Sequence, residues 1–131
     1  VLAAMMAQGV IPVFYHPDVE VCTNVSQACA GGGAKCIEFT NRGDCASHVF
    51  YDVTRHFAKA DPSVIMGVGS VVDAPTAGIF IANGAKFVVG PILNADVANI
   101  HGRSLAYSFQ SFQYLYAPRI ISVAAGAGCL H

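Results

Sequence analysis

The sequence alternates short apolar runs with amphipathic stretches, and this alternation limits the possible folds more than any other feature. Four runs rich in β-branched and aromatic residues begin near residues 11, 36, 64 and 87, so that one unit repeats about every 25 residues. A helical pattern follows each run. Strands this apolar that are separated by helices are buried on both faces and are therefore parallel. The pattern predicts an α/β chain built from repeated strand–helix units.

Local signals predict where these elements begin and end. Strands are expected over residues 9–15, 36–40 and 87–91, and the third strand together with its exit loop over residues 64–72. The first of the helices that follow is expected to start at Pro17-Asp18, and the N-caps of the next three are expected at Asp44, Asp73 and Asn94. The apolar face of the first of these helices is predicted from Val21, Cys22, Val25, Ala28 and Cys29. Three consecutive glycines, 31–33, are expected to end that helix.

Two architectures contain such units: an open, doubly wound sheet and a closed (β/α)8 barrel. Both place functional groups at the C-terminal ends of the strands. The GxGxxG fingerprint is absent after the first strand, which argues against a dinucleotide site. Gly67 and Gly69 in the third strand match it only in part, and are expected to let the backbone pack closely or approach a ligand.

Composition excludes several classes of protein. The chain of 131 residues is 54% hydrophobic and 11% charged, with a net charge of −1, whereas an average domain is about 25% charged. This balance excludes disorder, and seven Lys and Arg make no basic stripe for nucleic acid. No uninterrupted apolar run reaches the roughly 18 residues of a membrane span. So few charges predict that another subunit covers apolar surface, which indicates a homo-oligomer.

Cysteines and histidines point to no metal site. The five cysteines form no CxxC pair, which favours reduced thiols and a cytoplasmic location. Cys22 and Cys29 are expected to pack in the core. The histidines lack metal-ligand spacing, and His16 is expected to cap or hydrogen-bond locally.

Polar residues at the strand ends are the candidates for function. Glu38 interrupts an apolar strand, and burying an unpaired carboxylate costs several kcal/mol, so Glu38 needs either a partner or a raised pKa. Arg42 in the following loop is able to pair with Glu38 or to bind an anionic ligand. Ser70 and Pro91 end the third and fourth strands, where each on its own is typical of a turn or a strand end.

The chain resembles the bacterial 2-keto-3-deoxy-6-phosphogluconate (KDPG) and 4-hydroxy-2-oxoglutarate (KHG) aldolases over residues 9–103. Four segments carry the resemblance, in this order: VIPVFYHPDVEVC, AGGGAKCIEFTNRGD, MGVGSVVDAPTA and GAKFVVGPILN. The most specific element is Glu38-x-Thr40-x-Arg42. The resemblance implies a TIM-type (β/α)8 barrel, of which this chain holds about four to five units. It also implies a trimer that uses no metal or organic cofactor.

By this resemblance the protein is a class I aldolase that cleaves a 2-keto-4-hydroxy acid to pyruvate and an aldehyde through a lysine Schiff base. Glu38 corresponds to the family's catalytic acid/base. Arg42 and Ser70 correspond to residues that hold the pyruvyl carboxylate, and Thr40 and Pro91 line the same pocket.

The resemblance ends near Arg103, and no lysine follows Lys86. Residues 1–131 are therefore expected to form a single partial barrel domain with a divergent tail over 104–131. The favoured interpretation is an aldolase chain that is truncated or misread after the fourth unit. The alternative is an inactive relative that binds keto acids or serves as an assembly module. The tail aromatics are expected either to cover an open sheet edge or to form a fifth strand.

Overall fold

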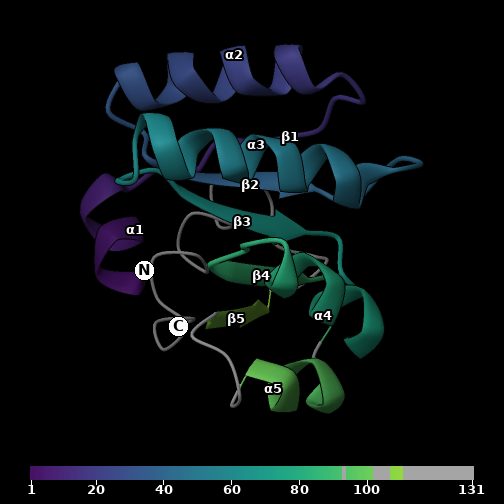
Figure 1. The fold of residues 1–131 in the computed structure, drawn as a ribbon. Helices are drawn as coiled ribbons and strands as arrows, with labels where there is room; N and C mark the ends of the chain where they lie inside the picture. The colour runs from purple at the N-terminus through teal and green to yellow at the C-terminus, as the bar shows by residue number, and fades with distance from the viewer. Residues whose placement is uncertain (93, 102–106, 111–131) are drawn as a thin grey trace.

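The computed structural model describes residues 1–92, 94–101 and 107–110. Their strands form one parallel sheet in sequential order, β1-β2-β3-β4-β5 (Figure 1). The strands are β1 (Val13–Phe14), β2 (Cys36–Thr40), β3 (Ile65–Gly69), β4 (Phe87–Gly90) and β5 (Tyr107–Gln110). The predicted parallel sheet is confirmed. Part of the tail forms the predicted fifth strand, and the rest of the tail lies outside the described residues.

Four helices connect these strands and cover one face of the curved sheet (Figure 1). They are α2 (Val19–Gly31), α3 (Ala46–Ala60), α4 (Ala74–Ala82) and α5 (Ala95–His101). Right-handed crossovers between strands in sequential order place every helix on the same side. A doubly wound sheet has helices on both faces, so this arrangement is of the barrel type.

The strands alternate their side chains between the helices and the opposite face. In β2, Ile37 and Phe39 are fully buried against the helical layer. The ring of Phe39 lies 5.7 Å from Phe50 of α3, which in turn lies 5.3 Å from Phe80 of α4. The other β2 side chains, including Glu38, therefore face away from the helices, toward what is the interior of a barrel.

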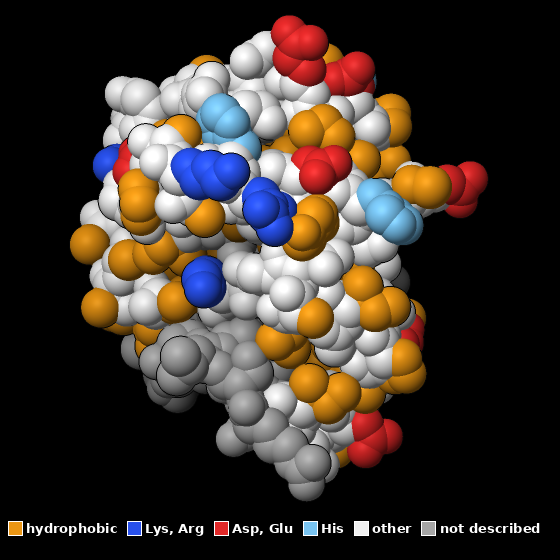
Figure 2. Space-filling view, in the orientation of Figure 1, with side chains coloured by type: hydrophobic (Ala, Val, Ile, Leu, Met, Phe, Trp, Pro, Cys, Tyr) orange, Lys and Arg blue, Asp and Glu red, His pale blue; other side chains and the backbone are white. Residues whose placement is uncertain are grey.

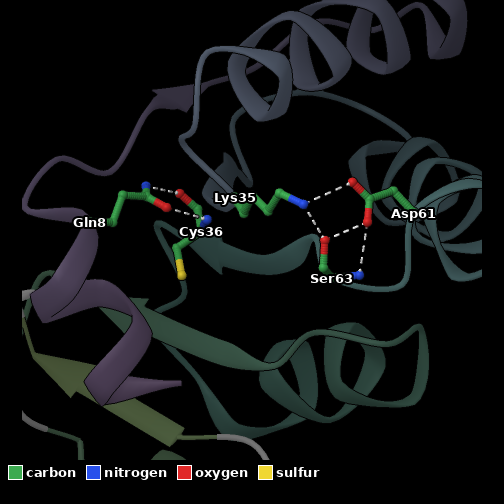
Figure 3. A network of polar contacts seen from close by, with 5 residues as sticks. All are labelled: Gln8, Lys35, Cys36, Asp61 and Ser63. Carbon is green, nitrogen blue, oxygen red and sulfur yellow. Dashed lines mark hydrogen bonds and ion pairs between the residues drawn. The ribbon is translucent and has the colours of Figure 1, made fainter.

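A helix that the sequence analysis did not predict, α1 (Leu2–Gln8), packs near the N-terminal ends of the strands. Met5 is buried against Cys36 and Phe87. The Gln8 amide accepts from the Cys36 N–H at 2.8 Å and donates to the Cys36 carbonyl at 2.9 Å (Figure 3).

The predicted length of the first strand is wrong: β1 covers only Val13–Phe14 instead of residues 9–15. Gln8 occupies the backbone groups of Cys36 that a longer strand would need, and Pro12 has no N–H to extend the ladder.

The helix starts are predicted correctly in three cases of four. Asp18, Asp73 and Asn94 each accept backbone N–H groups of the first turn. Asp44 does not cap α3, because Cys45 intervenes as the N-cap in a left-handed conformation (φ 59°) with no side-chain cap. The glycines do end α2, where Gly33 has a φ of 96°.

The predicted apolar face of α2 is partly wrong. Cys22 is buried and Cys29 half-buried as expected, but Val21 and Val25 are 39% and 37% exposed, and Ala28 is exposed as well. Ser26 is buried in their place, four residues after Cys22. The buried stripe of this helix is thus rotated toward positions 22, 26 and 29, because the contacts with the sheet and α3 set its orientation.

The Asp73 cap provides a test of these local signals. Asp73 accepts from the Thr76 N–H at 2.8 Å and from the Thr76 hydroxyl at 2.9 Å. We expect Asp73→Ala to lower the free energy of unfolding by about 1 kcal/mol in urea denaturation. Asp44→Ala is the matched control and should change it by less than about 0.5 kcal/mol. Equal losses in the two variants would contradict this assignment of the caps.

No helix among the described residues is long and apolar enough to cross a membrane. The described cysteines, Cys22, Cys29, Cys36 and Cys45, are all free thiols.

Candidate active site

A cavity of about 230 Å³ lies at the C-terminal ends of β1 to β4. It is lined by Val13, Glu38, Thr40, Arg42, Ser70, Val89 and Pro91. All five residues selected from the sequence therefore meet in one place. Val13 and Val89 are not predicted from the sequence. Val13 is the parallel partner of Glu38 in β1, and this register is a property of the folded sheet that the sequence does not carry.

Glu38 is the acidic group of this cavity. Its side chain projects from the middle of β2, and the residue is only 9% exposed. Burial raises the pKa of Glu38 from 4.5 to about 7, and the positive charge of Arg42 opposes that rise. A carboxyl group with a pKa near 7 is populated in both protonation states at neutral pH, so it can donate a proton and accept one.

Arg42 lies in the loop after β2 and is exposed. The structural Glu38–Arg42 ion pair that the sequence left open is not formed: within residues 1–92, 94–101 and 107–110, the ion pair is between Lys35 and Asp61. The Arg42 guanidinium is therefore available to an anion at the mouth of the cavity.

Hydrogen bonds hold the rim of the cavity. Thr40 donates its hydroxyl to the Phe14 carbonyl at 3.3 Å, which ties β2 to β1. The Asn41 N–H donates to the Gly69 carbonyl at 2.9 Å, which ties the Arg42 loop to β3. Ser70 has a φ of 61°, a left-handed conformation that is strained for a residue with a side chain. Such strained residues cluster at functional sites.

The lysines lie elsewhere. Lys35 precedes β2, donates to Asp61 at 3.3 Å, and also donates to Ser63 (Figure 3). Lys86 precedes β4 and lines a separate groove between α3 and α4, and Lys59 lies in the last turn of α3. Figure 2 views the helical side of the molecule, where basic side chains lie over and beside α3. None of the three lysines in the sequence lines the cavity that holds Glu38.

The described residues contain no group of three His, Cys, Asp or Glu side chains placed to hold a metal ion. His16 Nδ1 accepts from the Asp18 N–H at 3.1 Å. This local bond before α2 is the role expected from the sequence.

Comparison with known proteins decides the family. The family model of KDPG and KHG aldolases matches residues 1–110. This chain belongs to that family. It is 31% identical over 94 residues to the 2-dehydro-3-deoxy-phosphogluconate aldolase of Pseudoalteromonas atlantica, an alignment that covers 71% of this chain and 42% of the relative. It is 30% identical over 82 residues to the KHG/KDPG aldolase of Escherichia coli K12, covering 63% of this chain and 37% of the relative. The chain thus spans about two fifths of the length of these curated relatives.

Solved structures of such aldolases share the fold. A KDPG aldolase from Legionella pneumophila, with pyruvate captured as a covalent carbinolamine intermediate, has a TM-score of 0.73 at 23% identity, covering 83% of this chain and 51% of that one. A KDPG aldolase from Zymomonas mobilis has a TM-score of 0.71 at 23% identity, covering 95% and 57%. The described sheet and helices therefore correspond to about half of a TIM-barrel-like fold, as the sequence predicts.

Proposed function

We propose that the native protein is a class I aldolase that cleaves a 2-keto-4-hydroxy acid to pyruvate and an aldehyde. The observation that carries the proposal is the buried Glu38 beside Arg42 in a cavity at the strand ends, in a chain of the KDPG and KHG aldolase family. In this proposal the chain supplies the acid/base group and the carboxylate site of the reaction.

Glu38 has the properties that the proton transfers need. In the cleavage direction an amine condenses with the C2 carbonyl and water leaves, which gives a protonated imine. Glu38 as carboxylate takes the proton of the C4 hydroxyl, and the C3–C4 bond breaks. C4 leaves as the aldehyde, and the electron pair of the broken bond moves into the imine to form the enamine of pyruvate. The protonated Glu38 then gives its proton to C3, and hydrolysis of the imine releases pyruvate and the free amine. A pKa near 7 lets Glu38 act in both directions of proton transfer.

In this proposal the substrate is bound by Arg42, Ser70, Thr40 and Pro91. Arg42 binds the substrate carboxylate through charge-assisted hydrogen bonds, and Ser70 adds its hydroxyl. Thr40 and Pro91 shape the wall of the cavity. No metal or organic cofactor enters this reaction, because the imine itself withdraws the electron pair.

Reduction in the presence of pyruvate tests the reaction class. We expect borohydride to leave one reduced pyruvyl group per active site on a lysine of the intact native protein, because borohydride reduces an imine to a stable amine. Intact-mass spectrometry with peptide mapping measures the increment and locates it. Absence of any increment would exclude Schiff-base catalysis.

Binding of pyruvate tests the carboxylate site separately. Loss of the charge-assisted hydrogen bonds in Arg42→Ala is expected to weaken pyruvate binding by about 10- to 100-fold in calorimetric titration. Arg55→Ala, on the helical side of the molecule, is the control and should leave the affinity unchanged.

The alternative function is a keto-acid-binding or assembly protein without turnover. The observation in its favour is that no lysine of this chain lines the cavity. It predicts saturable pyruvate binding that Arg42→Ala weakens, with no product and no borohydride adduct.

We also propose that the protein is a homo-oligomer, a trimer by family resemblance. Large apolar side chains are exposed on the described surface, among them Val72 at 55%, Ile79 at 53% and Ile92 at 60%. Figure 2 shows hydrophobic side chains spread between the few charged ones on one face. Native mass measurement gives the subunit number. A cytoplasmic location remains a prediction from the cysteine pattern.

A further inference from the structure

The carboxyl group of Glu38 occupies space that a side chain on Gly69 would fill. An ideal Cβ built on Gly69 would lie 1.7 Å from Glu38 Oε1, 2.6 Å from Cδ and 3.2 Å from Cγ. Real Cβ atoms essentially never approach other heavy atoms closer than 3.0 Å. Gly69 is the last residue of β3, which pairs with β2. Because Gly69 has no side chain, the carboxyl of Glu38 has room to lie beside it.

No other described contact holds the carboxyl there. Among the described residues, no hydrogen bond or ion pair reaches the side-chain oxygens of Glu38. Arg42, in the loop at the mouth of the cavity, affects the carboxyl only through its positive charge. The position of the carboxyl therefore depends on the shape of the surrounding strands, and at Gly69 this shape leaves room for its oxygen only because the residue has no Cβ.

We propose that Gly69 is a positioning residue for Glu38, keeping open the space that directs the carboxyl into the keto-acid cavity. This inference rests on the proposed function. From the sequence, the glycines of β3 are expected to allow close packing or the approach of a ligand. At Gly69 the group that approaches is the chain's own acid/base.

Gly67, two residues earlier on the same face of β3, has a different role. Its Cβ would lie 2.3 Å from two carbon atoms of the Phe87 ring, which is fully buried. A buried ring has no free space to move into, so Gly67 serves core packing. Glu38, in contrast, ends in a flexible carboxyl that can turn away toward the open cavity. Neither glycine has a positive φ, so the backbone accepts alanine at both positions.

The test is Gly69→Ala in the full native protein. We expect turnover to fall by ~10²-fold, because a displacement of about 1 Å at a reacting group has an effect of that order. Pyruvate affinity should stay within about twofold, since Arg42 is untouched. Gly78→Ala on α4, where no atom lies within 4 Å of the added Cβ, is the control and should leave turnover unchanged.

Two double variants show whether Gly69 acts through Glu38. Adding Gly69→Ala to Glu38→Gln should cause no further loss of turnover, because the displaced group is already inactive. Any destabilisation by Gly69→Ala should disappear in a Glu38→Ala background, where the clash is removed. A full additional loss in either background, or unchanged turnover in Gly69→Ala alone, would overturn the proposal.

A readout independent of turnover separates this inference from the proposed function. Titration of the Glu38 carboxyl by NMR should show its midpoint moving down in Gly69→Ala, because the displaced group regains solvent. That shift in a protein without aldolase activity would reject the proposed function and keep the positioning role. Normal aldolase activity of the wild type, with an unshifted Glu38 midpoint in Gly69→Ala, would reject the positioning role and keep the proposed function.

Discussion

Glu38→Gln is expected to lower the turnover of a 2-keto-4-hydroxy acid by ~10²–10⁴-fold, the range in which a general acid/base contributes. Glutamine keeps the shape of the side chain but cannot accept the proton of the C4 hydroxyl. Steady-state release of pyruvate, measured with a coupled reductase, gives the rate. Pyruvate affinity should change little, because Arg42 and not Glu38 carries the positive charge in the cavity.

The dependence of the rate on pH distinguishes the wild type from Glu38→Gln. The wild-type rate should change near pH 7, where Glu38 titrates, and the residual rate of Glu38→Gln should lose that transition. Equal rates for wild type and Glu38→Gln would show that another group moves the proton.

Stability should also depend on Glu38 and pH. Since folding raises the pKa of Glu38 from 4.5 to about 7, the folded state disfavours the ionised form. Below about pH 4.5 the group is protonated in both states and its burial carries no electrostatic penalty. As the pH rises to about 7, Glu38 ionises in the unfolded chain before it ionises in the folded one. The free energy of unfolding of the wild type therefore falls by about 3 kcal/mol relative to that of Glu38→Gln. Urea denaturation of both proteins at pH 4 and pH 8 measures this difference.

Phe50→Ala is expected to destabilise the protein by about 3–5 kcal/mol, the range for removing a buried aromatic side chain. Phe50 is fully buried on α3 and lies between Phe39 of β2 and Phe80 of α4. Its removal opens a cavity where the sheet and two helices meet. Chemical denaturation gives the free energy of unfolding, and thermal unfolding of the same samples should show a lower midpoint.

His48→Ala is the matched control for Phe50→Ala, because it lies on the same helix and is exposed. It should change the free energy of unfolding by less than about 0.5 kcal/mol. A loss below 1 kcal/mol for Phe50→Ala would mean that the junction of β2, α3 and α4 is not the core of the protein.

Most of the architecture could be predicted from the sequence, because it depends on local periodicity. The apolar runs at β2, β3 and β4 and the caps at Asp18, Asp73 and Asn94 are signals within a few residues of one another. Predictions failed where distant contacts override such signals. Gln8 shortens β1 through the backbone of Cys36, and α2 turns Val21 and Val25 outward.

The candidate residues of the site could be found for a related reason. A carboxylate in an apolar strand is conspicuous in any sequence, and the carboxyl ends of parallel strands converge on one edge. Val13 and Val89 could not be found in this way, because apolar residues in strands carry no signal that separates a cavity wall from a core.

The parallel strand–helix order, the family resemblance and the candidate residues Glu38, Thr40, Arg42, Ser70 and Pro91 can all be read from the amino-acid sequence. How these groups are related in space follows from the folded sheet. It separates Arg42 from an ion pair with Glu38, sets the three lysines apart from the cavity, and places the Glu38 carboxyl where Gly69 has no side chain. Distances across a sheet depend on register and strand order, and these bring together residues that are far apart in the chain.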